Sequence, residues 1–296
     1  MYFNKFSKKA KLLNVDWFIT KRCNQTDYCR FCFAPRDAFP HDATFEVAMS
    51  ICNRLAELGV EVVTLCGGEP MLYPHLAKVI KNLHSLGIKV VLYTNATTDF
   101  DIYSLFPFIQ ILSLPVDAIK PEIIKEMRGP EQFKAVCHLL AKLRIVARRP
   151  TVKIGTVVSR VNLNDLKNIF RFISESGVVD IWRLYQFSPY GHGKNNDNLF
   201  LIADDEFIRA VGDIKSSAKR SAINIFERSR NSTIGNCHIM DSAGNFYRYE
   251  EKYVPLDATI FDKPQKIIDG YANFSYQERK IWHLLIENLN KFNKKE

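Results

Sequence analysis

Three cysteines lie close together in the chain. Cys23, Cys29 and Cys32 fall within the segment ITKRCNQTDYCRFCF, residues 19–33, with five and then two residues between them. Three thiolates in one loop can hold an iron–sulfur cluster and leave one iron open to a substrate or cofactor. A zinc site would need a fourth ligand, which His41 could supply. The neighbouring residues are polar and charged, which argues against three buried structural thiols.

A second motif, CGGEP, occupies residues 66–70. Two glycines would let the backbone approach a ligand closely. Glu69 offers a carboxylate to an ammonium group through a charge-assisted hydrogen bond. A turn followed by a helix that begins at Pro70 would also explain these residue types. It would not explain why they accompany a three-cysteine loop.

Together, the two motifs resemble the radical S-adenosylmethionine (SAM) superfamily. The usual cysteine spacing there is three then two, so the first interval here is two residues longer, while Phe31 keeps the aromatic residue before the last cysteine. The resemblance implies one [4Fe-4S] cluster held by Cys23, Cys29 and Cys32. It also implies that the second motif contacts the SAM amino group, through Gly67, Gly68, Glu69 and Pro70.

Four further residues match the superfamily by position. The resemblance implies that Thr94 and Asn95 lie near the cofactor, that Ser113 contacts its ribose and that Arg128 binds its carboxylate. Ser113 could instead be a polar strand end, and Arg128 a cation at a helix C-terminus. In this superfamily the reduced cluster cleaves SAM to methionine and a 5′-deoxyadenosyl radical, which removes a hydrogen atom from the substrate. An external one-electron donor of the flavodoxin or ferredoxin type is implied.

Apolar, strand-like segments alternate with helical ones along the first two thirds of the chain. The predicted strands are 15–20, 62–66, 88–93, 109–114, 151–158 and 181–187. Serial β-α units form a parallel sheet with right-handed crossovers. A closed barrel of eight units needs about 250 residues, whereas six units end here near Ser188. We therefore predict an α/β fold, a partial (βα)6 TIM-like barrel over residues 14–190, with a doubly wound sheet as the alternative.

The remaining residues are predicted to form a tail and an extension. Residues 1–13 form the N-terminal tail, and residues 191–296 an α+β extension that covers the barrel. Within the extension we expect a helix at 204–218, a hairpin around the AGN turn at 243–245 and a closing helix at 276–289. A further short strand is expected at 222–226.

Several segments of the chain resemble viperins, which dehydrate nucleoside triphosphates. They are VKIGTVVSRVN (152–162), IWRLYQF (181–187), LIADDEF (201–207) and CHIMDSAGNFYRY (237–249). The formal charge of +9 favours a polyanionic partner, although lysine-rich ends could simply keep the chain soluble. Substrate-binding candidates are the basic residues at predicted strand ends and a histidine in the PYGHGK loop: Lys21, Arg160, Arg183 and His192.

The composition narrows the remaining classes of function. Apolar residues make up 47% of the chain, yet no apolar run approaches the ~18 residues of a membrane span, and the first residues do not form a secretory signal. We expect a cytoplasmic radical SAM enzyme that acts on a small anionic molecule such as a nucleotide. The alternatives are a radical SAM enzyme that modifies a peptide or tRNA, and a non-enzymatic metal-binding module.

Overall fold

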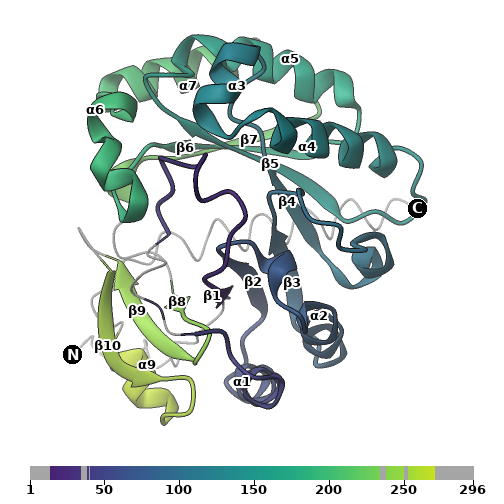
Figure 1. Ribbon diagram of the computed structural model, residues 1–296, viewed down its shortest axis with the longest axis vertical. Helices are drawn as coiled ribbons and strands as arrows, with labels where there is room; N and C mark the ends of the chain where they lie inside the picture. Colours follow the sequence, from purple (N-terminus) through teal and green to yellow (C-terminus); the bar gives the residue numbers. More distant parts are fainter. Residues whose placement is uncertain (1–13, 35–38, 40, 234–237, 250–252, 271–296) are drawn as a thin grey trace, which may run out of the picture.

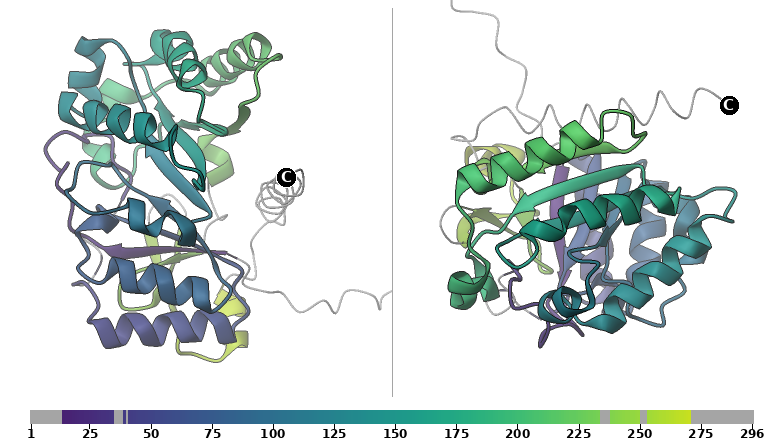
Figure 2. Two further views of the ribbon diagram at one scale, coloured as in Figure 1. Left: turned by 90° about the vertical axis from the view of Figure 1, so that its right-hand side faces the viewer. Right: turned by 90° about the horizontal axis from the view of Figure 1, so that it is seen from above.

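The computed structural model describes residues 14–34, 39, 41–233, 238–249 and 253–270. These residues form one curved, mixed sheet of ten strands, with helices packed along its outer face (Figures 1 and 2). The predicted tail at 1–13 and the predicted closing helix at 276–289 lie outside the described residues. In the described ranges, no helix is long and apolar enough to cross a membrane.

Seven strands run parallel and follow one another across the sheet in chain order. They are β1 (Asn14–Thr20), β2 (Val62–Gly67), β3 (Lys89–Tyr93), β4 (Ile111–Pro115), β5 (Thr151–Val158), β6 (Ile181–Gln186) and β7 (Asn224–Arg228). The six predicted βα units are present. The strand expected at 222–226 is β7, which pairs in parallel with β6 and makes the parallel sheet one strand wider than the predicted units. The edge strands β7 and β10 are not neighbours, so the barrel is open.

Helices pack along the outer face of this sheet (Figure 2), and the longer ones between its strands bury their apolar residues in the main core. The helix α1 (Phe45–Glu57) begins where the Thr44 side chain accepts a hydrogen bond from the Val47 N–H, and it ends before Gly59, whose φ is 71°. Its buried stripe includes Cys52, so that thiol belongs to the core. The other α-helices are α2 (Leu76–Ser85), α3 (Pro121–Met127), α4 (Pro130–Leu143), α5 (Leu166–Ser176), α6 (Asp197–Phe200), α7 (Asp204–Ser217), α8 (Arg230–Thr233) and α9 (Pro264–Gly270). Short 3₁₀ turns are η2 (Pro70–Leu72), η3 (Tyr103–Phe108), η4 (Leu163–Asp165) and η5 (Gly191–Asn196).

The two faces of the parallel sheet differ in chemistry. Side chains alternate along a strand, so one set of positions packs under the helices and the other lines the concave side. The helix-facing set is apolar and belongs to the main core, as with Trp17, Leu65 and Trp182. The concave set carries buried polar residues, among them Thr64, Ser113, Lys153 and Arg183. This polar inner face is where the fold can hold a charged ligand.

The C-terminal strands continue the same sheet beyond β1. The strand β8 (Ile239–Met240) pairs in parallel with β1 and antiparallel with β9 (Asn245–Tyr249), which pairs antiparallel with β10 (Tyr253–Thr259). The predicted hairpin around residues 243–245 is therefore confirmed. Its turn is fixed by the buried Asp241 carboxylate, which accepts hydrogen bonds from the Ala243 and Asn245 N–H groups at 2.9 Å.

Candidate functional site

The loop that carries the three cysteines leaves the carboxyl end of β1. Its turns are closed by hydrogen bonds from the Cys29 N–H to the Gln25 carbonyl at 3.0 Å and from the Cys32 N–H to the Cys29 carbonyl at 3.1 Å. Cys29 is buried, while Cys23 and Cys32 are partly exposed. Burial raises the pKa of Cys29 to about 11, and the neighbouring Cys32 and Cys23 thiols add to that increase while Arg128 opposes it. The three sulfur atoms are therefore close enough to influence one another.

These thiols are not arranged around a single ion. Among the described residues, no three His, Cys, Asp or Glu side chains come together as ligands of one metal ion. His41 is among those residues, so the zinc alternative gains no support. A cluster differs from a single ion because each thiolate binds a different iron.

The glycine motif packs directly against the start of the cysteine loop. The Gly68 N–H donates to the Thr20 carbonyl at 2.8 Å, and the Glu69 N–H donates to the Arg22 carbonyl at 2.7 Å. A Cβ atom on Gly67 would lie 2.3 Å from the Thr20 oxygen, and one on Gly68 would lie 2.0 Å from the Arg22 oxygen. The φ of Gly67 is 135°, which other residues rarely adopt. The glycines thus allow two segments of this chain to approach each other closely.

The Glu69 carboxylate is buried beneath the loop that follows β3. One oxygen, Oε1, accepts hydrogen bonds from the Met71 N–H at 3.0 Å and the Thr94 hydroxyl at 2.7 Å. The other, Oε2, accepts from the Asn95 N–H at 2.7 Å. Burial raises the pKa of Glu69 to about 7, and these three hydrogen bonds only partly oppose that shift. Sequence reasoning placed Glu69, Thr94 and Asn95 near a cofactor, and the structure brings all three together.

Asn24, next to the first cysteine, joins the cysteine loop to the loop after β3. Its Oδ1 accepts from the Asn95 Nδ2 at 2.8 Å, and its Nδ2 donates to the Thr97 hydroxyl at 2.9 Å. No local sequence pattern points to a role for Asn24, because its partners are more than seventy residues away in the chain. Three post-strand loops are therefore linked by polar contacts at one edge of the sheet.

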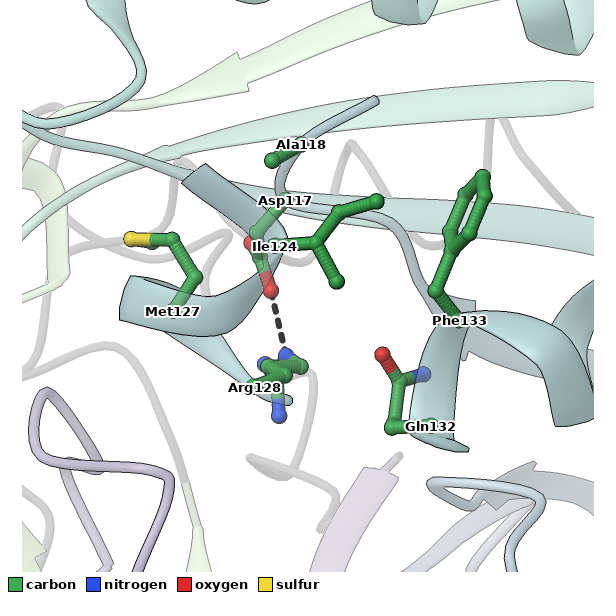
Figure 3. Close-up of a pocket in the computed structure, with 7 residues that line it drawn as sticks. All are labelled: Asp117, Ala118, Ile124, Met127, Arg128, Gln132 and Phe133. Carbon is green, nitrogen blue, oxygen red and sulfur yellow. Dashed lines mark hydrogen bonds and ion pairs between the residues drawn. The ribbon is translucent and has the colours of Figure 1, made fainter. Parts of the chain in front are cut away.

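Arg128 follows α3, and its side chain contacts both Asp117 and the cysteine loop; Figure 3 shows the contact with Asp117. Its Nε forms an ion pair with the buried carboxylate of Asp117, and its Nη1 donates to the Cys29 sulfur at 3.4 Å. Arg128 and Asp117 line a small pocket. Its other lining residues are Ala118, Ile124, Met127, Gln132 and Phe133. Ser113, the predicted ribose contact, is buried on the concave face and paired in register with Lys153.

The loop after β6 supports the cysteine loop from its other end. The Gly193 N–H donates to the Cys32 carbonyl at 2.9 Å, and a Cβ on Gly191 would lie 2.4 Å from the Phe33 oxygen. His192, between these glycines, is exposed. The glycines of the PYGHGK segment thus serve close backbone packing beside Cys32.

Of the four predicted substrate residues, only Arg183 is buried on the concave face. There it lies beside Lys153: the Lys153 ammonium contacts the hydroxyls of Tyr93 and Tyr185, the latter at 3.3 Å. The Arg183 guanidinium stacks over the Tyr185 ring, 5.3 Å from its centre. Arg160 is exposed, with its Nε on the Leu201 carbonyl at 3.2 Å, and Lys21 reaches the Phe39 carbonyl at 3.5 Å.

The buried group of Lys153, Arg183, Tyr93 and Tyr185 has shifted pKa values. Burial lowers the pKa of Lys153. Burial alone would raise the pKa of Tyr185, but the positive charges of Lys153 and Arg183 outweigh it and lower that pKa to about 8. Tyr93 belongs to this buried group but was not predicted from the sequence. A tyrosine at a strand end cannot be distinguished there from an ordinary packing residue.

Comparisons with known proteins identify a family and several relatives of this chain. The profile of the Radical SAM superfamily matches residues 17–173. An S-adenosylmethionine-dependent nucleotide dehydratase of Flammeovirga pacifica is 24% identical over 288 residues, covering 90% of this chain and 94% of that protein. A protein of the same description from Lacinutrix mariniflava is 25% identical over 263 residues, covering 83% of this chain. This chain spans about half (52%) of that longer relative.

Solved structures share the fold at low sequence identity. The structure of native anSMEcpe with bound AdoMet has a TM-score of 0.67 at 14% identity and covers 88% of this chain and 82% of that one. SuiB from Streptococcus suis has a TM-score of 0.66 at 16% identity, with 80% of this chain and 60% of that chain covered. The predicted partial barrel is confirmed by this likeness.

Proposed function

Because this chain belongs to the Radical SAM superfamily, we propose that it is a nucleotide-modifying member with the reaction class of the nucleotide dehydratases it matches. A radical SAM enzyme uses a [4Fe-4S] cluster and SAM. When bound, the two supply a 5′-deoxyadenosyl radical that removes a hydrogen atom from the substrate. The protein supplies binding, orientation and exclusion of water.

The residues present fit the cluster. Cys23, Cys29 and Cys32 lie in one loop, which is hydrogen-bonded to the glycine motif on one side and to Gly193 on the other. Burial, with a smaller contribution from the neighbouring thiols, raises the pKa of Cys29, and coordination to iron would offset both effects by neutralising the thiolates. We propose these three residues as the cluster ligands.

The residues around Glu69 and Arg128 fit SAM. A carboxylate offers about four acceptor positions, and three are used in Glu69, so one position on Oε2 is left for the SAM ammonium. Arg128 has five N–H groups, of which its contacts with Asp117 and Cys29 use two. The others can bind the SAM carboxylate. We propose Gly67, Gly68, Pro70, Thr94, Asn95 and Ser113 as further SAM-binding residues.

The observation that carries the nucleotide proposal is a pair of buried cations without an ion-pair partner. Lys153 is 2% exposed and Arg183 4%, and neither forms an ion pair with any described residue; the Asp16 carboxylate raises the pKa of Lys153 less than Tyr185 does. The Arg183 Nε is also a buried donor that lacks a hydrogen-bond partner within the described ranges. Buried charges in proteins are paired, so this site favours an anion. A phosphate chain fits, since guanidinium and ammonium groups bind it with charge-assisted hydrogen bonds.

The phenols of Tyr93 and Tyr185 hold the Lys153 ammonium on the concave face. Their hydroxyls lie 3.4 Å apart, with the Lys153 nitrogen in contact with both. Arg160 and His192 lie on loops at the same edge of the sheet and could reach the outer part of a nucleotide. We also propose that residues 14–190 bind the cofactors and that residues 191–296 are an extension of the barrel, since the described strands β7 and β8 of that segment add to the sheet at both ends.

An external one-electron donor of the flavodoxin or ferredoxin type is part of this proposal. The cysteine loop presents two large aromatic side chains, Tyr28 and Phe33, which are 52% and 53% exposed. Exposed apolar side chains beside a cluster suit transient docking of such a donor.

The test is anaerobic reconstitution followed by measurement of 5′-deoxyadenosine with and without nucleoside triphosphates. Nucleotides should stimulate its formation above the uncoupled background. Arg183→Gln should reduce that stimulation roughly tenfold or more, because it removes a buried charged donor. Arg183→Lys keeps the positive charge and should retain part of the stimulation by nucleotides. Arg209→Gln is the matched control, since Arg209 is exposed on α7 and pairs only with Asp205 among described residues.

Three outcomes would contradict the proposal. One is no stimulation by any nucleotide while a neutral peptide gives strong turnover, which would favour the peptide alternative. A second is equal loss in Arg183→Gln and Arg209→Gln, which would assign the effect to net charge. A third is full iron content after Cys23, Cys29 or Cys32 is replaced by Ala, which would reject the cluster ligands.

A further inference from the structure

Arg128 lies between three groups that together fix its guanidinium beside one cysteine. Its Nε pairs with Asp117, its Nη1 donates to the Cys29 sulfur at 3.4 Å, and its Cζ lies 4.9 Å from the centre of the Phe31 ring. The ion pair is visible in Figure 3. The Arg128 side chain is 19% exposed and that of Asp117 1%. A planar cation held on its edge by a carboxylate and on its face by a ring has little freedom to move away from the sulfur.

Asp117 is itself held firmly. Its Oδ1 accepts from the Val157 N–H at 2.6 Å, and its carbonyl accepts from the Asn162 Nδ2 at 2.7 Å. An arginine guanidinium does not lose its proton in proteins, so the group that Asp117 holds beside the sulfur is a cation. By contrast, the Cys23 sulfur accepts the neutral N–H of Gln25 at 3.4 Å.

We propose that Arg128 tunes the reduction potential of the cluster by donating a charged hydrogen bond to the Cys29 ligand, and that Asp117 positions it. This rests on the proposed function, in which Cys29 binds the cluster. Reduction makes the cluster more negative, and hydrogen bonds to ligand sulfurs are among the factors that set such potentials. A cationic donor on sulfur stabilises the reduced state. Arg128 therefore favours acceptance of the electron from the external donor.

The experiment compares reconstituted wild type with Arg128→Gln, Arg128→Lys, Asp117→Asn and the control Arg30→Gln. Arg30 lies next to Cys29 in the cysteine loop, but its guanidinium forms an ion pair with Glu126. Iron and sulfide are measured first, and the potential is then titrated by electron paramagnetic resonance without SAM. Omitting SAM separates this role from binding of the SAM carboxylate.

In Arg128→Gln the equilibrium constant for one-electron reduction should fall about tenfold, which corresponds to about 59 mV toward lower potential. Arg128→Lys and Asp117→Asn should give smaller shifts in the same direction, and Arg30→Gln none. Unchanged reduction potentials in both Arg128 variants at full iron content would overturn this inference and leave the proposed cluster ligands unaffected. If Cys29→Ala retains full iron, the proposed cluster assignment fails instead, and iron content distinguishes that result.

Discussion

Replacing Gly68 by Ala is expected to separate the two motifs that define the site. The added Cβ would lie 2.0 Å from the Arg22 oxygen and 2.8 Å from the Lys21 oxygen, both of them backbone atoms that cannot rotate away. The motif must then shift from the cysteine loop and break two hydrogen bonds, from the Gly68 N–H to the Thr20 carbonyl and from the Glu69 N–H to the Arg22 carbonyl. At about 0.5–1.5 kcal/mol each, their loss should cost about 1–3 kcal/mol of unfolding free energy.

Urea unfolding of the metal-free protein measures this cost, and iron content after reconstitution reports whether the cysteine loop keeps its shape. The matched control is Gly212→Ala. Gly212 lies in α7, and a Cβ added there would have no described atom within 4 Å, so alanine should stabilise the helix by up to about 1 kcal/mol. If Gly68→Ala is as stable as wild type and binds iron normally but loses SAM affinity, the glycine serves the ligand rather than the loop, and the packing argument is refuted.

Two further predictions concern buried acids. Burial raises the pKa of Glu69 from 4.5 to about 7, so its contribution to stability is fully present below pH 4.5 and is lost as the pH rises through 7. Relative to Glu69→Gln, wild-type unfolding free energy should fall by up to about 3 kcal/mol between pH 4.5 and 8; parallel curves would contradict this. Burial opposes ionisation of Tyr185, but Lys153 and Arg183 lower its pKa to about 8. Near-ultraviolet absorbance should therefore show a tyrosine that ionises near pH 8. This transition should be absent from Tyr185→Phe and kept in Tyr190→Phe. An unchanged titration in Tyr185→Phe would contradict the effect of Lys153 and Arg183 on Tyr185.

Local residue order was enough to predict the superfamily and its partial barrel. The cysteine loop and the CGGEP motif each lie within a few residues, and each follows an apolar strand. Parallel strands place such loops at one edge of the sheet, so their proximity could be inferred before any coordinates. Strand β7 was harder to place, because the alternation that marks a strand does not say which neighbour it will join.

Long-range contacts were beyond the sequence. The partners of Asn24 are Asn95 and Thr97, and those of Arg128 are Asp117 and Cys29; no local pattern connects them. The same holds for the glycine motif, whose residue types suit approach to a ligand or to backbone equally well. Only the folded chain shows the Thr20 and Arg22 carbonyls in the space a side chain would need.

The sequence by itself determined which chemistry this protein carries, because ligand types and their spacing are local properties of the chain. The tertiary structure decided which charges are buried and what they face. Lys153 and Arg183 differ little in sequence from other basic residues near strand ends, yet they lie on the concave face in contact with phenols rather than carboxylates. Burial and pairing depend on strand register and on how neighbouring strands are brought together, and these are set when the whole sheet folds.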